Sequence, residues 1–147
     1  MKPVKKRIRK TIGLTDFISM PEAGISNIPC KVDTGADTNA IHCERVRIRV
    51  MDGKEFLSFK LLDRKHPLYS GIEMNIEQFK EIRVKSSFGD YEYRYQVELP
   101  FKLFNKNYTA AFNLSNRKNM KYPVLLGRKF LAGSFIVDVS KRNLSQK

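Results

Sequence analysis

Short segments in which polar and apolar residues alternate run through most of this sequence. The clearest is 45–50, where arginines alternate with Val and Ile, and a turn at 51–54 joins it to an apolar segment at 55–61. Alternation with a period of two places successive side chains on opposite faces of a strand, whereas an amphipathic helix needs a period near 3.6. The sequence therefore predicts a β-hairpin in this region.

Further strands follow from the same pattern and from the turn residues between them. The segments 79–86 and 91–99 alternate on either side of 87–90, which predicts a second, longer hairpin. The region 62–78 lacks the pattern, so we expect a surface loop that holds at most a short strand. The other predicted elements are strands at 11–20 and 28–32 around a turn at 21–24, strands at 102–104 and 108–113 around 105–107, a strand that enters one short helix within 124–131, and a last strand at 135–139.

These elements predict an all-β fold with one short helix near the C-terminal end. The chain has 147 residues, which suits one domain with its own core, and its 10 Phe and 6 Tyr favour sheets over long helices. The charge-rich ends lack periodicity. We therefore expect a basic N-terminal arm at 1–10, one domain at 11–139 and a polar C-terminal tail at 140–147, with ends that order on contact.

The charge of the chain bears on its partners rather than on its reaction. Lys and Arg number 28 against 15 Asp and Glu, which gives a formal net charge of +13. Such a surface attracts polyanions, so nucleic acid, ribosomes and acidic polypeptides all remain open as partners. The sequence has no run of about 18 apolar residues that could span a bilayer, and no apolar signal-peptide core follows its basic start. We therefore expect a soluble, cytoplasmic protein with no membrane among its partners.

The segment 32–38, Val-Asp-Thr-Gly-Ala-Asp-Thr, carries the most chemical information. An apolar strand runs directly into Asp33 and delivers its carboxylate to a turn of small residues. Gly35 and Ala36 allow a close backbone approach and leave room for a substrate chain, and the hydroxyl of Thr34 can brace the turn. A purely structural turn, in which Asp33 bonds its own backbone, is the alternative to a catalytic role.

Two signatures together resemble those of the retropepsins, the aspartic peptidases of retroviral type. The residues 33–36, followed by Asp37, are similar to the Asp-Thr-Gly-Ala signature that carries the catalytic carboxylate in that family. There, an apolar pair, a glycine, an arginine and a short helix close the site from behind, and 124–131 matches this order. The similarity extends over most of 11–139, with the hairpin at 79–96 between the two signatures. The residues of the second signature are Leu125, Leu126, Gly127 and Arg128.

Within the retropepsins, the chain resembles a bacterial and archaeal group often catalogued as ATP-dependent zinc proteases, some of which accompany ATP-grasp glutamate ligases. The segments that carry this closer resemblance are 12–14, 21–29, 32–42, 86–87 and 120–123. The sequence contains neither a Gly-rich Lys-Ser/Thr phosphate loop nor a His-Glu-x-x-His helix, so its residues do not support ATP or zinc chemistry. The resemblance therefore implies an aspartic peptidase that uses no cofactor and no metal.

An aspartic peptidase needs two carboxylates, but Asp-Thr-Gly occurs once in the chain. The resemblance therefore implies a homodimer with a closed, barrel-like acid-protease fold. Each subunit would contribute Asp33, and the pair would share one proton because adjacent like charges resist ionising together. The ionised member would act as general base on a bound water, and the protonated member would polarise the scissile carbonyl. The termini of the two chains would interlace in a shared sheet.

The same resemblance implies roles for residues around the catalytic carboxylate. Thr34 would bond across to the partner chain, and Arg128 would pair with Asp37, which would face the substrate backbone. A plain surface ion pair is the alternative for Arg128 and Asp37. The tip of the hairpin at 79–96 would be a flap that covers the substrate and excludes water. The tip residues are Ser86, Ser87, Phe88 and Gly89, with one glycine where the viral flap has several.

Four other residues could be imagined as a zinc site, namely Cys30, His42, Cys43 and His66. Their spacing fits no common ligand pattern, and His42 and Cys43, being adjacent on a predicted strand, point in opposite directions. We expect both cysteines to be structural thiols and His66 to lie at the surface.

Two other functions remain open. The chain could be a catalytically silent retropepsin-like module that binds an acidic partner such as RNA or a ribosomal protein, or a β-barrel nucleic-acid binder unrelated to peptidases. An unrelated nucleic-acid binder would explain the charge and the tyrosine stripe at 91–95, but it would leave the paired signatures to coincidence. Such a stripe more often packs within a sheet than serves as a base-stacking platform. For an active peptidase, the charge and the glutamate-ligase association favour a polypeptide substrate with an acidic tail.

Overall fold

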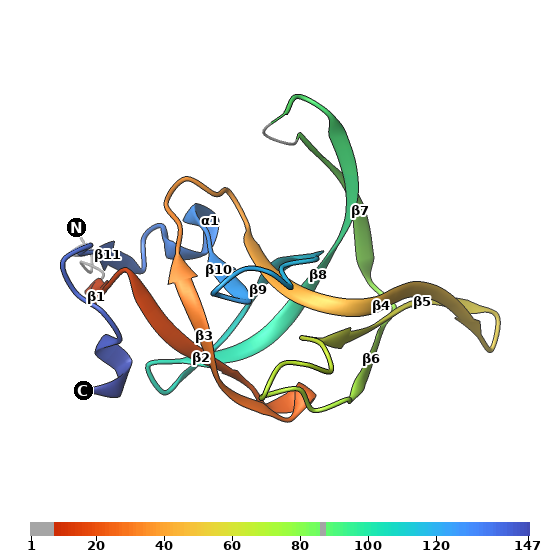
Figure 1. Ribbon diagram of the computed structural model, residues 1–147, viewed down its shortest axis with the longest axis horizontal. Helices are drawn as coiled ribbons and strands as arrows, with labels where there is room; N and C mark the ends of the chain where they lie inside the picture. Colours follow the sequence, from red (N-terminus) through yellow and green to blue (C-terminus); the bar gives the residue numbers. More distant parts are fainter. Residues whose placement is uncertain (1–7, 86–87) are drawn as a thin grey trace, which may run out of the picture.

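The computed structural model describes residues 8–85 and 88–147 and consists mainly of β-strands (Figure 1). The prediction of a mainly β chain with one short helix near Arg128 is confirmed. None of the helices within these two ranges is long and apolar enough to cross a membrane. In chain order the elements are β1 (Lys10–Ile12), β2 (Thr15–Met20), the 3-10 turn η1 (Pro21–Ala23), β3 (Ile25–Val32), β4 (Asn39–Met51), β5 (Lys54–Leu61), β6 (Glu73–Ile76), β7 (Phe79–Lys85), β8 (Tyr91–Leu103), β9 (Lys106–Ser115), β10 (Val124–Leu126), α1 (Arg128–Leu131), β11 (Phe135–Val137) and the 3-10 turn η2 (Leu144–Gln146).

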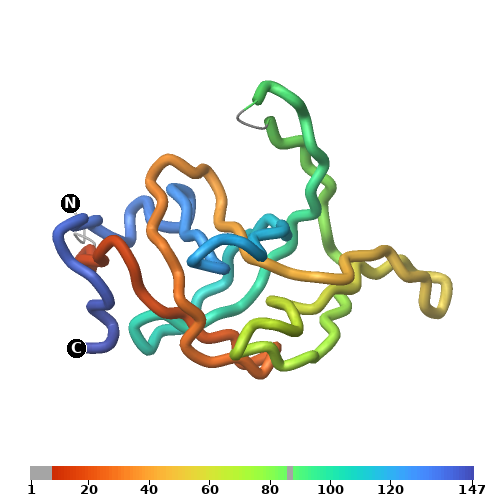
Figure 2. Tube along the Cα trace, viewed as in Figure 1, coloured from red at the N-terminus to blue at the C-terminus, as the bar shows by residue number. Residues whose placement is uncertain are grey.

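Most of the strands form one large sheet, in which neighbouring strands follow the order β10-β3-β2-β8-β9-β4-β5-β6, and β7 pairs with β8. β10 pairs with two strands, in parallel with β3 and antiparallel with β4. The parallel pairs β10–β3 and β4–β9 bring distant parts of the chain together. β1 and β11 form a separate parallel pair, so the N-terminal and C-terminal segments lie side by side (Figure 2).

Two hairpins close through two-residue turns in which both residues have positive φ angles. Asp52 and Gly53 (φ 53° and 77°) join β4 to β5, and Phe104 and Asn105 (φ 50° and 60°) join β8 to β9. Two consecutive positive φ values are typical of a type I′ turn, whose twist matches that of the antiparallel strands it connects. The turn predicted at 105–107 therefore begins one residue earlier, at Phe104.

Two of the predicted divisions of the chain into strands are wrong, for different reasons. The segment 11–20, predicted as one strand, breaks at Gly13 because the C-terminal segment crosses there, and a Cβ on Gly13 would collide with the carbonyl oxygen of Lys141. The segments 91–99 and 102–104, predicted as separate, are joined in the single strand β8, which ends at Leu103, because β9 pairs with it across the gap between them.

The core is made of apolar side chains, most of them from the large sheet. Phe59, Phe101 and Phe112 are almost completely buried, and the rings of Phe101 and Phe112 meet edge to face with their centroids 5.4 Å apart. Burial of one such side chain stabilises the fold by roughly 1.5–3 kcal/mol. This core fixes the strands, and the strands fix the loops that leave their ends.

The C-terminal segment packs against β2. The backbone N–H of Asn143 donates to the carbonyl of Thr15 at 2.8 Å, and the backbone N–H of Ser145 donates to the carboxylate of Asp16 at 3.2 Å. Asp16 is 1% exposed and also accepts a bond from the Ser145 hydroxyl. Residues 140–147, expected to be a polar tail that orders on contact, thus have specific partners in their own chain; the domain boundaries themselves stay a prediction.

Two hairpins project from the body of the domain (Figures 1 and 2). One is formed by β4 and β5. The other is the hairpin predicted at 79–96, formed by β7 and the first part of β8, and it projects on the side of the loop between β3 and β4. We call it the flap hairpin. The region 62–78, expected to hold at most a short strand, contains β6.

Candidate active site

Asp33 follows β3 directly and lies beside β10. The two strands are parallel, with Val32 opposite Leu126, and the Asp33 N–H donates to the Leu126 carbonyl at 2.9 Å. The sheet therefore brings together the two signatures found in the sequence. Of the apolar pair in the second signature, Leu126 is fully buried and Leu125 is partly exposed. We call residues 33–38 the Asp33 loop.

Backbone groups hold the carboxylate within the Asp33 loop. The Gly35 N–H donates to Oδ1 of Asp33 at 2.9 Å, and the Ala36 N–H donates to the Asp33 carbonyl at 3.2 Å. A Cβ at Gly35 would lie 3.2 Å from the same Oδ1, so a larger residue there would crowd the carboxylate. Asp33 is partly exposed, and its bond to Gly35 fixes the direction of the side chain. A carboxylate that is both oriented and accessible can act as a general base.

The second signature closes the Asp33 loop from behind. Gly127 passes so near that a Cβ on it would lie 2.8 Å from the carbonyl carbon and oxygen of Thr38. At the start of α1, the Arg128 N–H donates to the Ala36 carbonyl at 2.8 Å. Glycine is required at 127 because two backbone segments touch there, which explains its place between the apolar pair and the arginine.

A buried asparagine that sequence interpretation did not single out completes this arrangement. Asn39 is 2% exposed, and its Oδ1 accepts the Gly127 N–H at 2.8 Å. Without this acceptor a backbone N–H would be buried and unpaired, which is costly. The bond spans 88 residues, so no local pattern marks Asn39 beyond its position directly after the Asp33 loop.

Arg128 lies against the outer side of the Asp33 loop. Its guanidinium pairs with the Asp37 carboxylate and donates to the Thr34 carbonyl at 3.0 Å. The side chains of Arg128 and Asp37 are 51% and 68% exposed, so the ion pair itself adds little to stability. The contact instead orients Asp37 and the backbone at Thr34. The roles that the resemblance assigns to these residues stay predictions.

The predicted flap tip is described in part. Phe88 is exposed, and Gly89 has a φ of 88°, which glycine adopts without strain. Ser86 and Ser87, the other two predicted tip residues, lie outside the described residues.

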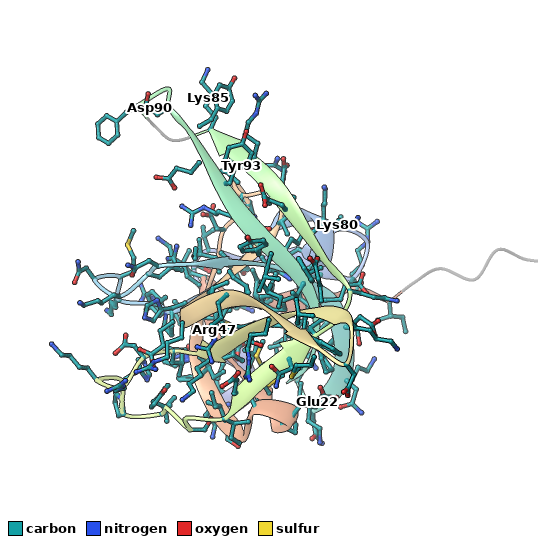
Figure 3. The ribbon with its side chains drawn as sticks, turned by 90° about the vertical axis from the view of Figure 1, so that its right-hand side faces the viewer. Glu22, Arg47, Lys80, Lys85, Asp90 and Tyr93 are labelled. Carbon is teal, nitrogen blue, oxygen red and sulfur yellow. The ribbon has the colours of Figure 1, made fainter. Side chains whose placement is uncertain are left out.

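The two faces of the flap hairpin differ in character. Ile82 and Arg94 are cross-strand neighbours and both line the cleft, whereas Tyr91 and Tyr93 are 54% and 69% exposed. Figure 3 shows Tyr93 on this projecting hairpin. The guanidinium of Arg83 lies over the ring of Tyr91, 4.1 Å from its centroid. At Tyr91 and Tyr93 the tyrosine stripe is therefore exposed, and the expectation of sheet packing is wrong for these two residues.

A cleft of about 800 Å³ lies between the Asp33 loop and the flap hairpin. Gly35 and Ala36 line it from the loop, and Ile82 and Val84 line it from β7. Its charge is strongly asymmetric, because Asp37 is its one acidic lining residue against six cationic ones. A cleft lined by an excess of positive charge attracts anionic ligands. The cationic residues are Lys80, Arg83, Lys85, Arg94, Arg117 and Lys129.

The residues weighed as a zinc site have other partners. Cys30 and Cys43 are buried, and burial raises the pKa of both thiols, that of Cys43 to about 12, so both are protonated at neutral pH. Both ring nitrogens of His42 and the Nδ1 of His66 are engaged in hydrogen bonds. Across residues 8–85 and 88–147, no three His, Cys, Asp or Glu side chains are grouped so as to hold a metal ion.

Comparison with known proteins finds a family match over almost the whole chain. Residues 11–147 match a RimB-like family model, described as retropepsin-like aspartic endopeptidase RimB. The chain is 33% identical over 134 residues to a probable alpha-L-glutamate ligase of Desulfotalea psychrophila, and 29% identical over 134 residues to one of Shewanella pealeana. Each match covers 88% of this chain and 28% of the relative, so the chain spans less than a third of the length of these relatives.

A solved structure shares the fold. It is the crystal structure of a Legionella pneumophila protein of unknown function, with a TM-score of 0.70 and 24% sequence identity. The match covers 92% of this chain and 98% of that chain. At this identity the likeness concerns the fold alone.

Proposed function

The chain belongs to the RimB-like family of retropepsin-like aspartic endopeptidases, and from this we propose that it hydrolyses peptide bonds with Asp33 as its catalytic carboxylate. One observation carries the proposal. The Asp33 loop and the second signature, far apart in sequence, meet through the Asp33–Leu126 and Arg128–Ala36 hydrogen bonds, and they present an oriented carboxylate beside a cleft large enough for a peptide.

The chemistry requires a second carboxylate, which a second copy of the chain would supply. In the resulting homodimer, one Asp33 would take a proton from a bound water while its protonated counterpart polarised the scissile carbonyl, so that no covalent intermediate is needed. Exposed apolar side chains near the paired β1 and β11, Ile136 at 53% and Val139 at 70%, offer surface that such a dimer would cover. A closed, barrel-like form belongs to the same proposal, and the pairing of β10 with both β3 and β4 supports it.

The residues around Asp33 would position the substrate. Gly35 and Ala36 leave space beside the carboxylate, and Asp37, oriented by Arg128, would accept hydrogen bonds from the substrate backbone. The flap hairpin would close over the cleft and exclude water other than the attacking molecule.

The charge of the cleft favours an acidic polypeptide as substrate. The lining contains six cationic residues and one acidic residue, Asp37, and of the cations Arg83 directs its guanidinium to Tyr91. A run of glutamates would still gain at several positions at once. The names of the relatives, probable alpha-L-glutamate ligases, agree with a glutamate-rich substrate.

The reaction is tested with two peptides, one rich in glutamate and one in which glutamine replaces each glutamate. Wild type should cleave the first faster, and Asp33→Asn should reduce the rate by at least about a hundredfold because it removes the general base while keeping the side-chain shape. Mass spectrometry of the products gives both results. Asp52→Asn, in the distant β4–β5 turn, is the matched control and should leave the rate unchanged. Cleavage that survives Asp33→Asn, or that a chelator abolishes, would contradict the mechanism.

The shared site is tested by mixing subunits. An excess of Asp33→Asn protein, added to wild type and left to exchange, should inhibit cleavage, because each mixed dimer holds one carboxylate instead of two. Sedimentation at the same concentrations reports the dimer directly. If the cleavage rate depended only on the concentration of wild-type subunits and not on the amount of Asp33→Asn protein added, a site built from two chains would be contradicted.

A second candidate is a catalytically silent module that binds an acidic partner such as RNA or a ribosomal protein. The exposed Tyr91 and Tyr93, with Arg83 stacked on Tyr91, favour it because aromatic and cationic side chains together suit single-stranded nucleic acid. It replaces the peptidase if neither wild type nor Asp33→Asn cleaves either peptide while both bind RNA with a steep salt dependence.

A further inference from the structure

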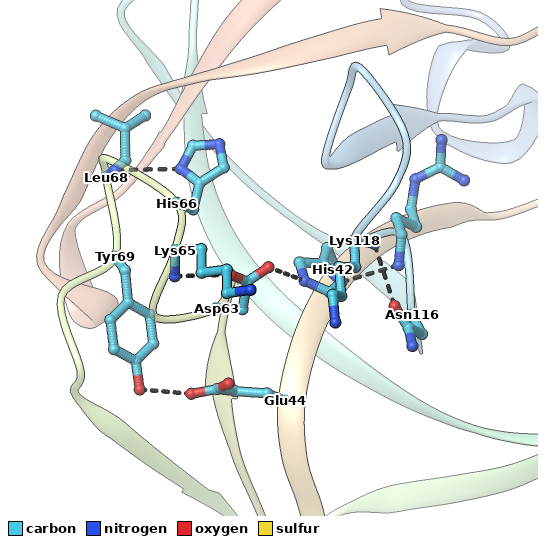
Figure 4. Close-up of polar contacts among 10 residues, drawn as sticks. His42, Glu44, Asp63, Lys65, His66, Leu68, Tyr69, Asn116 and Lys118 are labelled. Atoms are coloured by element: carbon cyan, nitrogen blue, oxygen red, sulfur yellow. Dashed lines mark hydrogen bonds and ion pairs between the residues drawn. The ribbon is translucent and has the colours of Figure 1, made fainter.

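A buried histidine joins two loops beside the cleft (Figure 4). His42, on β4, is 4% exposed, and its Nε2 lies 2.6 Å from Oδ2 of Asp63. Its Nδ1 accepts the backbone N–H of Arg117 at 2.8 Å. A backbone N–H can only donate, so Nδ1 carries no hydrogen in this bond and Nε2–H donates to Asp63. The two bonds therefore fix the tautomer and the orientation of the ring.

The backbone of His42 holds the same two loops. Its N–H donates to the carbonyl of Pro123 at 2.8 Å, and its carbonyl accepts the N–H of Leu62 at 2.9 Å. The segment 116–123 is thus attached to β4 at both ends, through Arg117 and Pro123. The Pro123 end is held by backbone alone, whereas the Arg117 end is held by the buried His42 side chain.

Arg117 is the side chain that this segment brings to the cleft. Its Nε donates to the carbonyl of Tyr122 at 3.2 Å, which directs the guanidinium, and the residue is partly buried. Burial lowers the pKa of the guanidinium, the Asp33 carboxylate opposes this effect, and Arg94 adds to it. Arg117 lines the cleft together with Arg94 and with Gly35 and Ala36 of the Asp33 loop, and an arginine in this setting keeps its charge.

The other five cations of the cleft are less suited to recognise one substrate group. Four of them are exposed, namely Lys80, Arg83, Lys85 and Lys129. Arg94 is partly buried but pairs with Glu92 at 2.8 Å. A partly desolvated guanidinium that is held in place loses less entropy on binding and interacts more strongly than a mobile surface lysine.

We infer that Arg117 is a specificity-determining residue that binds a carboxylate side chain of the substrate next to Asp33, and that His42 with Asp63 is the pair that positions it. The inference rests on the proposed peptidase function and adds to it the residues that select the substrate. Arg117 binds the anionic group directly, whereas His42 acts through the Arg117 backbone.

Peptide binding tests the first part without requiring cleavage. In the Asp33→Asn background, Arg117→Met should weaken binding of the glutamate-rich peptide by about tenfold or more, the loss expected for one charge-assisted contact, and should leave binding of its glutamine isostere unchanged. Arg117→Lys should restore part of the loss. Fluorescence anisotropy at fixed salt measures each affinity.

The matched control is Lys118→Met. Lys118 is the next residue of the same segment and carries the same charge, but it is exposed and lines a different cavity together with Asp63 and Asn116. This variant should change the affinity for the glutamate-rich peptide less than twofold. Equal losses for Arg117→Met and Lys118→Met would overturn the inference, because they would show that the overall field of the protein attracts the peptide.

Two substitutions at His42 test the positioning role. His42→Asn can present an oxygen near the place of Nδ1 and keep the bond to the Arg117 N–H, whereas His42→Gln can reach Asp63 in place of Nε2 but leaves that N–H without its acceptor. His42→Asn should retain most of the preference for the glutamate-rich peptide over its glutamine isostere, and His42→Gln should lose it. The two variants should have the same thermal stability. The opposite order, or equal preference in both variants, would overturn the positioning role.

The inference and the proposed function fail separately. If wild type cleaves both peptides but Arg117→Met changes neither the KM nor the affinity, the peptidase stands and the role of Arg117 is wrong. If no variant cleaves anything but Arg117 still governs binding of the glutamate-rich peptide, the peptidase is wrong and the recognition site stands.

Discussion

The Asp33 loop and the flap hairpin border the same cleft but are held in place differently. The loop is fixed by hydrogen bonds to β10 and α1, by the buried Asn39, and by contact with Gly127. In the flap hairpin, β7 pairs with one described strand, β8, and the aromatic side chains Tyr91 and Tyr93 are exposed. The Asp33 loop, which holds the carboxylate, should therefore tolerate few substitutions. The flap hairpin, which would cover the substrate, makes fewer contacts and should tolerate more.

Glycine substitutions give the largest expected contrast between the two regions. Gly127→Ala should destabilise the protein by about 3 kcal/mol and abolish cleavage, because its Cβ would lie 2.8 Å from the Thr38 backbone and push the Asp33 loop aside. Gly89→Ala meets nothing within 4 Å and should cost about 1 kcal/mol, the strain of a positive φ. Urea denaturation gives both values. Similar costs at the two positions would contradict the contrast.

Removal of one buried acceptor should have the next largest effect. Asn39→Ala leaves the Gly127 N–H unpaired and should destabilise the protein by about 2 kcal/mol, with a loss of activity because the Asp33 loop is displaced. Asn107→Ala, at an exposed asparagine of β9, is the control and should stay within about 0.5 kcal/mol of wild type. If the two variants unfold at the same urea concentration, the Asn39 bond does not hold the loop.

The His42–Asp63 hydrogen bond should make the stability of the protein depend on pH. The hydrogen bond from His42 lowers the pKa of the Asp63 carboxyl, so this bond stabilises the fold above the unfolded-state pKa of about 3.9, and the stabilisation disappears as the pH falls through the lower folded-state value. Asp63→Asn should therefore lower stability by about 1.5 kcal/mol at pH 7, and the difference from wild type should shrink as the pH falls below about 4.

Thermal denaturation at several pH values measures this effect. Asp90→Asn, at an exposed aspartate of the flap hairpin, provides the comparison and should change the melting temperature little at any pH. A difference between wild type and Asp63→Asn that grows on acidification would contradict the assignment of the bond.

Exposed flap residues should give the smallest effect. Tyr93→Ser removes a side chain that is 69% exposed and should change the free energy of unfolding by less than about 0.5 kcal/mol. Differential scanning fluorimetry detects a larger change. A cost near that of Asn39→Ala would mean that the outer face of the flap hairpin is packed against something in solution, and the two regions would then be held alike.

The parts of the site that could be predicted from the sequence are those in which all the residues lie in one short continuous segment. The Asp33 loop and the second signature each occupy one short stretch, and the hairpins follow from local alternation and turn residues, so local patterns sufficed. The position of Gly127 against the loop accords with the closing role expected of the second signature, although the catalytic roles themselves stay predictions.

The rest depends on contacts between residues far apart in sequence, which local patterns do not encode. Asn39 matters because of Gly127, and Arg117 because of His42, and neither pair is visible before the strands are assembled. The break at Gly13 has the same origin, since the residue that interrupts the strand is Lys141. The net charge of the sequence predicted an anionic partner, but it did not indicate that several cationic residues line the cleft.

The hydrogen bonds that shape the Asp33 loop join residues 88 and 94 positions apart. Contacts across such distances close large loops, and they form late because the entropy of loop closure opposes them. During synthesis from the N-terminus, Asp33 leaves the ribosome well before Leu126 and Arg128. A nascent chain would therefore display the Asp-Thr-Gly sequence without an assembled centre, and the proposed hydrolysis would begin only after β10 and α1 have docked.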